Sequence, residues 1–247
     1  MSSTDPELLL AIETSARVGS VAIQRAGRPA VLRALTGDRR HTAELMPAIQ
    51  DLLGEHNVQL SDVDVLAWAC GPGSFTGLRI GATVARMAAS AAKCRIVSVP
   101  TLDVIARNAQ NLVGEAPTSI VVILDAQTER IYAATYVCRG VEPLRRTSEP
   151  AVYENPAEVL AKLAPPFLLL GEGVTRHRAV CEASGGTIAR EDLWAPSASA
   201  VAELGMQMAA AGRFAEPNEI LPLYLRPPAC EEVYEKRRAE ARARRGE

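Results

Sequence analysis

The sequence has few of the residues from which metal centres and disulfide frameworks are built. Its three histidines, His41, His56 and His177, include no pair at H-x-x-x-H spacing, because Leu45 stands four residues after His41. One imidazole cannot form the two-histidine metal site of a helix. The five cysteines are scattered and include no C-x-x-C pair, which argues against a disulfide framework or a zinc site. We expect no metal site, and reduced thiols in a cytosol.

Long apolar runs are also missing. No run approaches the ~20 apolar residues of a membrane span. The first seven residues, MSSTDPE, have neither the basic start nor the apolar core of a signal sequence. We therefore expect a cytoplasmic globular protein that makes no contact with a membrane.

The chain lacks a net charge that would attract nucleic acid in general. Its 27 Lys and Arg residues nearly balance 29 Asp and Glu residues, so contact with nucleic acid needs a local patch. The strongest candidate is the charged tail at residues 228–247, whose arginines can reach phosphate groups. The glutamates between these arginines favour a solvated tail instead.

The most informative stretch runs from residue 63 to residue 92. An unbroken apolar run at 65–70 predicts a strand that is buried on both faces, and the sequence GPGSFTG then forms a turn into a helix. Helical spacing from Leu78 onward separates three faces, so we expect packing on two sides and a third side that faces water or a partner. These faces are a bulky apolar stripe (Ile80, Val84, Met87, Ala91), a small-residue stripe (Gly81, Ala85, Ala88, Ala92) and a basic polar stripe (Arg79, Thr83, Arg86, Ser90, Lys93).

The glycine turn has two interpretations. Free N–H groups at the start of a helix attract anions, which makes Gly71, Gly73 and Ser74 candidate phosphate-binding residues. The turn lacks the lysine of a P-loop and does not match G-x-G-x-x-G, and a G-x-S-x-G serine elbow is excluded because Pro72 and Thr76 replace its glycines. A tight turn into a close-packed helix explains the same glycines without a ligand.

The chain repeats one plan. Residues 8–12 predict a strand that ends at Glu13, followed by a polar turn and a return strand at 18–23, and residues 120–137 repeat this plan with Asp125 in place of Glu13. The apolar run and G-x-G at 167–173 likewise repeat those at 65–73. We therefore predict an internal duplication of two α/β lobes, at residues 1–112 and 113–227, followed by the tail.

A helix is predicted between the third strand (31–35) and the central stretch. Asp38 or Thr42 can cap it. Pro47 lies in its early turns, so the helix either begins near Met46 or is kinked there.

Five motifs, IETS (12–15), HTAELMPAI (41–49), GPGSFTGLRIG (71–81), VPTL (99–102) and PLYLR (222–226), resemble those of the TsaB (YeaZ) family. The resemblance spans residues 8 to about 226 and implies an actin-like, Hsp70-like ATPase fold of the ribonuclease H-like type, with two duplicated lobes. It also implies a non-catalytic partner of TsaD, which with TsaE installs threonylcarbamoyl on the adenosine beside the anticodon of ANN-decoding tRNAs. No cofactor is then expected on the isolated chain, and ATP or ADP and a metal ion are expected on the partner subunits. The usual D-A-R-R of the family is D-A-Q-T here, at residues 125–128.

On this basis we expect the first helix and the central helix to pair and to dock on the matching helices of TsaD. A standard interface would bury ~1,600 Å², and a homodimer through the same surface is expected when TsaD is absent. Arginines of the central helix facing Glu44, Asp51 or Glu55 would set its register. The alternative is that both helices simply cover the sheet of their own lobe. The candidate interface residues are Leu45, Met46, Ile49, Leu52, Leu53, Leu78, Arg79, Thr83, Arg86 and Met87.

A second class of function is an autonomous ATP-dependent phosphotransferase or ATPase. It would use Glu13, Asp125 and the glycine turns at 71–73 and 171–173 around a nucleotide. Each acid has a structural alternative, in which a carboxylate at the end of a strand accepts hydrogen bonds from the N–H groups of the following turn. Cys70 ends a buried strand with no histidine nearby in the sequence, so we expect it to pack in the core.

Overall fold

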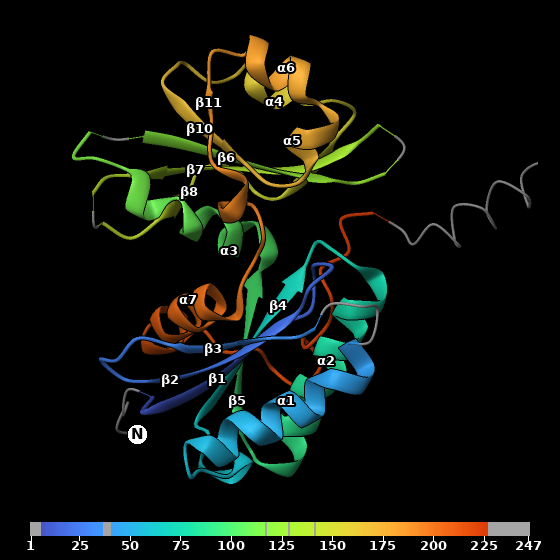
Figure 1. The fold of residues 1–247 in the computed structure, drawn as a ribbon, viewed down its shortest axis with the longest axis vertical. Helices are drawn as coiled ribbons and strands as arrows, with labels where there is room; N and C mark the ends of the chain where they lie inside the picture. Colours follow the sequence, from blue (N-terminus) through green and yellow to red (C-terminus); the bar gives the residue numbers. More distant parts are fainter. Residues whose placement is uncertain (1–5, 37–40, 117, 128, 141, 227–247) are drawn as a thin grey trace, which may run out of the picture.

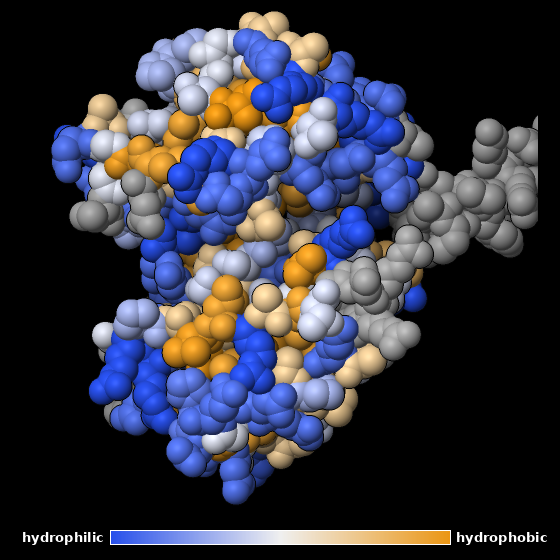
Figure 2. All heavy atoms as spheres, viewed as in Figure 1, coloured by the Kyte–Doolittle hydropathy of each residue, from blue (hydrophilic) through white to orange (hydrophobic). Residues whose placement is uncertain are grey.

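The protein consists of two α/β lobes joined at a narrow waist (Figure 1, Figure 2). This computed structural model describes residues 6–36, 41–116, 118–127, 129–140 and 142–226. Each lobe is built on one sheet, and the outer surface of both lobes in Figure 2 is mostly polar, with apolar atoms gathered over the region of α7 and β3.

The sheet of the first lobe has the order β3-β2-β1-β4-β5. β1 pairs antiparallel with β2, and β4 and β5 run parallel to β1. All seven residues of β4 are buried, which confirms the prediction of a strand covered on both faces. The strands are β1 (Leu8–Glu13), β2 (Ser20–Arg25), β3 (Val31–Ala34), β4 (Val65–Gly71) and β5 (Arg95–Pro100).

The sheet of the second lobe repeats this plan. Its order is β11-β10-β6-β7-β8, with β6 antiparallel to β7 and parallel to β10, so β6 and β10 correspond to β1 and β4. Gly71, the last residue of β4, and Gly171, which follows β10, both have positive φ, +122° and +102°. The predicted duplication is therefore confirmed. The strands are β6 (Thr118–Asp125), β7 (Ile131–Cys138), β8 (Arg145–Arg146), β9 (Ala151–Tyr153), β10 (Phe167–Leu170) and β11 (Thr187–Ile188), and β9 also pairs with β7.

Helices cover both faces of each sheet (Figure 1). In the first lobe α1 and α2 lie on one face and α7 on the other, and in the second lobe α3 lies on the face toward the waist while α4, α5 and α6 lie on the outer face. The helices are α1 (His41–Glu55), α2 (Phe75–Ala91), α3 (Thr101–Asn108), α4 (Ala157–Leu160), α5 (Gly173–Arg176), α6 (Arg178–Ala183) and α7 (Ala198–Ala210), with short 3₁₀ turns at Leu60–Asp62, Gln110–Leu112 and Glu191–Leu193.

Two helices cross between the lobes, so the predicted division at residues 112 and 113 needs correction. α3 follows the first sheet in the chain, but its Leu102 and Ile105 pack in the core of the second lobe. α7 follows the second sheet, but its Ala198 and Val201 pack against the first sheet. The hydrophobic pattern of each helix predicts that it is buried, but not which sheet buries it. The predicted tail at 228–247 lies outside the described residues.

The start of α1 also differs from one expectation. The helix begins at His41 and continues through Pro47, so it does not begin near Met46. Asp38 and the side chain of Thr42, the two candidate caps, lie outside what the structure describes, as does the side chain of His41.

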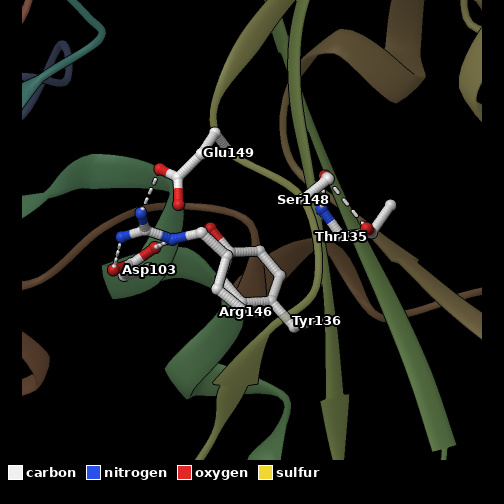
Figure 3. Close-up of polar contacts among 6 residues, drawn as sticks. All are labelled: Asp103, Thr135, Tyr136, Arg146, Ser148 and Glu149. Carbon is white, nitrogen blue, oxygen red and sulfur yellow. Dashed lines mark hydrogen bonds and ion pairs between the residues drawn. The ribbon is translucent and has the colours of Figure 1, made fainter.

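A polar network attaches α3 to the second sheet (Figure 3). The hydroxyl of Tyr136 donates to Asp103 Oδ1 at 2.8 Å, and Arg146 forms a bidentate ion pair with the same carboxylate, with its Nε 3.1 Å from Oδ1. Arg146 also pairs with Glu149 at 2.7 Å. Burial, followed by the charge of Asp103, raises the pKa of Tyr136 well above its ordinary value, which keeps this phenol a hydrogen-bond donor.

We expect Asp103→Ala to lower the free energy of unfolding by about 2 kcal/mol, because it leaves two partly buried donors without their acceptor. A urea titration measures this loss. The matched control is Asp192→Ala, which removes an exposed ion pair with Arg190 and is expected to cost under about 1 kcal/mol. Equal losses in the two variants would contradict a structural role for the network.

Candidate functional site

The glycine turn is bound to the loop between β1 and β2. Ser74 is the N-cap of α2, and its Oγ accepts a hydrogen bond from the N–H of Gly77 at 3.3 Å. The N–H of Ser74 donates to the carbonyl of Ser15 at 2.7 Å. Two N–H groups at the start of α2, those of Ser74 and Gly77, therefore have protein partners, and one of these partners belongs to the loop that follows the adjacent parallel strand β1.

The glycines of this turn let its backbone approach the backbone of the β1–β2 loop closely. A Cβ atom added at Gly77 would lie 1.9 Å from the carbonyl oxygen of Thr14, and one added at Gly73 would lie 2.5 Å from that of Ser15. A Cβ at Gly81 would lie 2.8 Å from Thr14 Oγ1. Protein atoms therefore occupy the space beside Gly73, Gly77 and Gly81, which explains these glycines by packing alone. Phosphate binding by Gly71, Gly73 and Ser74 stays a prediction.

Glu13 organises the same loop from inside the lobe. Its side chain is fully buried, and Oε1 accepts hydrogen bonds from the N–H of Ser15 at 2.6 Å, the hydroxyl of Ser15 and the N–H of Ala16 at 3.3 Å. Among the described residues, Oε2 has no hydrogen-bond partner. Burial raises the pKa of Glu13 from 4.5 to about 7, against the opposing effect of these hydrogen bonds. Its contacts are those of the structural alternative, a carboxylate that fixes a turn.

Asp125 occupies the equivalent place in the second lobe. It accepts a hydrogen bond from the N–H of Gln127 at 2.8 Å and forms an ion pair at 3.0 Å with Arg176 of α5. The sequence offered no signal for Arg176, which is 51 residues away along the chain. Gln127 is exposed and has φ +63°, and Thr128 lies outside the described residues.

The second glycine turn is also a packing feature. A Cβ at Gly171 or Gly173 would lie 2.3 or 3.0 Å from the carbonyl oxygen of Ile123 in β6. Burial, followed by the charge of Asp125, raises the pKa of Glu172 between them. Within the described ranges, no cluster of three or more His, Cys, Asp or Glu side chains is placed to hold a metal ion.

The face formed by α1 and α2 contains the residues predicted to contact a partner, and the structure divides them into two groups. Half of them pack inside the first lobe and support the helices from beneath, and a direct contact of these residues with a partner stays a prediction. The remainder are half-buried or exposed. The buried group is Leu45, Ile49, Leu52, Leu53 and Leu78, and the accessible group is Met46, Arg79, Thr83, Arg86 and Met87.

The small-residue stripe of α2 faces the sheet. Gly81, Ala85 and Ala88 are buried, and a Cβ at Gly81 would lie 3.3 Å from the ring of Trp68. This close approach turns the bulky stripe outward, so that Met87 is 54% exposed. The stripes were predicted from the sequence, but which of them faces the core was not.

A groove with a volume of about 470 Å³ runs between α1 and α2. Most of its wall is apolar, and its polar lining residues are Thr76, Arg79 and Thr83. Phe75 was not among the predicted site residues, although it lines this groove. The groove is lined by Leu45, Met46, Phe75, Thr76, Arg79, Ile80, Thr83 and Val84.

Comparison with known proteins agrees with this architecture. A family model described as TsaD, tRNA N6-adenosine threonylcarbamoyltransferase, matches residues 36–173. The tRNA threonylcarbamoyladenosine biosynthesis protein TsaB of Escherichia coli is 29% identical over 88% of this chain and 94% of that protein. An uncharacterized protein of Mycobacterium tuberculosis is 30% identical over 92% of this chain and 96% of its own length. The structure of YeaZ from Pseudomonas aeruginosa superposes with a TM-score of 0.73, at 27% identity, over 89% of this chain and all of that one. The chain belongs to the TsaB (YeaZ) family.

Membership of the TsaB family agrees with the fold described above. The two duplicated lobes form the actin-like ATPase fold that the resemblance implied. The family motif GPGSFTGLRIG has a direct physical explanation in this TsaB-family chain, because two of its glycines, Gly73 and Gly77, admit the backbone of the β1–β2 loop. Across the part of the chain that the structure covers, no helix is both long and apolar enough to cross a membrane.

The acids of α1 have partners within this TsaB-family chain. Arg33 of β3 forms ion pairs with both Asp51 and Glu55. Glu44 accepts hydrogen bonds from the N–H and the hydroxyl of Thr36, each at 2.7 Å. The expected pairing of these acids with arginines of α2 across an interface would therefore compete with contacts that already exist.

Proposed function

We propose that this chain is the accessory subunit of the machinery that makes threonylcarbamoyladenosine in tRNA. In this proposal it binds TsaD in the cytoplasm, supports transfer of the threonylcarbamoyl group to the adenosine beside the anticodon, and carries no catalytic centre itself. TsaE and tRNA join through the complex, ATP or ADP and a metal ion belong to the partner subunits, and the chain pairs with itself when TsaD is absent. Its membership of the TsaB family supports this proposal.

The observation that carries the proposal is the outward face of α2. The inner stripe of this helix is already packed against Trp68 and the sheet, yet Met87 and the apolar groove beside α1 remain accessible. We take this accessible apolar surface to be the contact with another protein. A pair of helices that offers a groove suits a second helical pair.

Reconstitution tests the proposed function. Purified chain, TsaD, TsaE, threonylcarbamoyl-adenylate and tRNA are combined, and each component is omitted in turn. We expect modified tRNA to require both this chain and TsaD, and the chain alone to be inactive. Micromolar binding of ATP and magnesium by the isolated chain, together with turnover, would instead support an autonomous phosphotransferase.

Replacement of one exposed apolar residue tests the docking face. We expect Met87→Glu to weaken binding to TsaD about 30-fold, because it places a charge in an apolar contact. The fold should be unaffected, since the side chain is 54% exposed. Leu112→Glu is the matched control, because Leu112 is 50% exposed but lies in the 3₁₀ turn after α3. Isothermal titration calorimetry measures both, and equal affinities would contradict docking through α2.

Arg86→Glu is a less direct test of the same face. The Nε of Arg86 donates to the carbonyl of Ile220 at 3.0 Å. Reversal of this charge would therefore disturb the C-terminal part of the chain as well as any partner contact.

A further inference from the structure

Residues 220–226, here called the C-terminal strap, lie against α2 and the end of β4. The N–H of Leu223 donates to the carbonyl of Cys70 at 2.7 Å. A Cβ at Gly71 would lie 2.7 Å from the carbonyl oxygen of Leu223, so the glycine at the end of β4 makes room for the strap. At its other end Arg226 donates to the carbonyl of Ala126 in the second lobe at 2.6 Å. The strap is thus fixed independently of any partner.

The strap and α2 together hold one guanidinium in place. The rings of Phe75 and Tyr224 lie with their centroids 5.4 Å apart, and the guanidinium carbon of Arg79 lies 3.9 Å from the centroid of Phe75. The Nε of Arg79 also donates to the hydroxyl of Tyr224 at 3.3 Å. A cation–π contact and a hydrogen bond from Nε therefore restrain a side chain that would otherwise sample many rotamers.

The terminal N–H groups of this arginine remain available. No described residue accepts a hydrogen bond from them or pairs with the charge. Two acids of α1, Asp51 and Glu55, are paired with Arg33 instead. Arg79 also lines the groove between α1 and α2, whose wall is otherwise mainly apolar. A restrained guanidinium on the rim of an apolar groove complements an amphipathic helix that carries a carboxylate beside its apolar side chains.

We propose that Arg79 is the charged anchor of the docking groove and that Tyr224 of the strap is its positioning residue. Arg79 would pair with an aspartate or glutamate on the partner helix while apolar side chains of that helix fill the groove. This inference rests on the proposed function, because it takes TsaD to be the occupant. It goes beyond that function by naming an ion pair between Arg79 and a carboxylate of the partner as the contact that determines specificity. It also gives the C-terminal strap the role of positioning Arg79.

Titration of the full-length chain with TsaD at low and high salt tests this inference. We expect Arg79→Ala to weaken binding about 30-fold and to reduce the salt dependence of the affinity. Tyr224→Phe keeps the ring against Phe75 and removes only the acceptor, so a smaller loss, about 3-fold, is expected. Because Tyr224 acts through Arg79, Tyr224→Phe should have no further effect once Arg79 is alanine. Arg28→Ala, an exposed arginine in the β2–β3 turn, is the control and should bind as the unmodified chain does.

Other outcomes separate this inference from the proposed function. If Met87→Glu loses binding while Arg79→Ala keeps the affinity and salt dependence of the unmodified chain, the face docks through apolar contacts alone and the anchor is wrong. If sedimentation shows that Arg79→Ala weakens only self-association, the occupant is a second copy and the assignment to TsaD is wrong. If the unmodified chain does not bind TsaD, both proposals fail. Unchanged urea midpoints in the variants exclude misfolding as the cause.

Discussion

Gly77→Ala is expected to lower the free energy of unfolding by about 3 kcal/mol, among the largest effects of any single methyl group in this chain. The added Cβ would lie 1.9 Å from the carbonyl oxygen of Thr14. That oxygen belongs to backbone which cannot move away easily, because Ser15 is bound both to Ser74 and to the buried carboxylate of Glu13. The α2 helix must therefore shift off the β1–β2 loop. A urea titration monitored by circular dichroism measures the loss.

The same substitution at Gly54 is the matched control. Gly54 lies inside α1, and a Cβ there would meet nothing within 4 Å. Gly54→Ala should raise the free energy of unfolding by about 0.5–1 kcal/mol, because alanine favours the helix and restricts the unfolded chain. If the free energy of unfolding falls for Gly77→Ala and rises for Gly54→Ala, close contact and not helix propensity accounts for the glycine motif. A gain in stability at Gly77 would contradict the packing described above.

The free energy of unfolding should depend on pH through the ionisation of Glu13. We expect Glu13→Gln to remove most of this dependence. The pKa of Glu13 is raised from 4.5 to about 7, so the folded state binds the proton more tightly than the unfolded chain. The stabilisation is complete below pH 4.5 and is lost as the pH rises through about 7. Proton linkage over this interval amounts to at most about 3 kcal/mol. At pH 8 the variant should therefore be the more stable protein, and near pH 5 the two should be similar.

Urea titrations at pH 5, 6, 7 and 8 measure this effect. Glu158→Gln, at an exposed position in α4, is the control and should keep the pH profile of the unmodified chain. A variant at Glu13 with the same profile as the unmodified chain would show that this carboxyl is ionised throughout the range and would contradict the assignment.

The parts of the fold that were predictable depend on local patterns. The apolar run of β4, the strand-and-acid plan around Glu13 and Asp125, and the three stripes of α2 repeat over a few residues, so the sequence displays them directly. The duplication followed from two such patterns in the same order. Each of these predictions concerns the chemistry of one segment, and none of them requires knowledge of a distant neighbour.

The features that were missed depend on contacts between distant segments. Tyr224 is 145 residues from Arg79, and Arg176 is 51 residues from Asp125. Helical spacing identified the stripes of α2 but not their orientation, which the ring of Trp68 and the loop at Thr14 decide by leaving room only for small residues. The crossing of α3 and α7 was missed for the same reason, since an apolar face is compatible with either sheet.

The exchange of helices between the lobes makes the two halves of the chain mutually dependent. A fragment that stops after the first sheet would lack α7, and Leu9, Ala11 and Val97 would lose the cover that this helix provides. A fragment that begins with the second sheet would lack α3, and Arg107 of α3 is in turn paired with Glu203 of α7 at 2.7 Å. Each half of the chain therefore relies on a helix from the other half to cover its sheet. We consequently expect the two lobes to unfold in one cooperative transition.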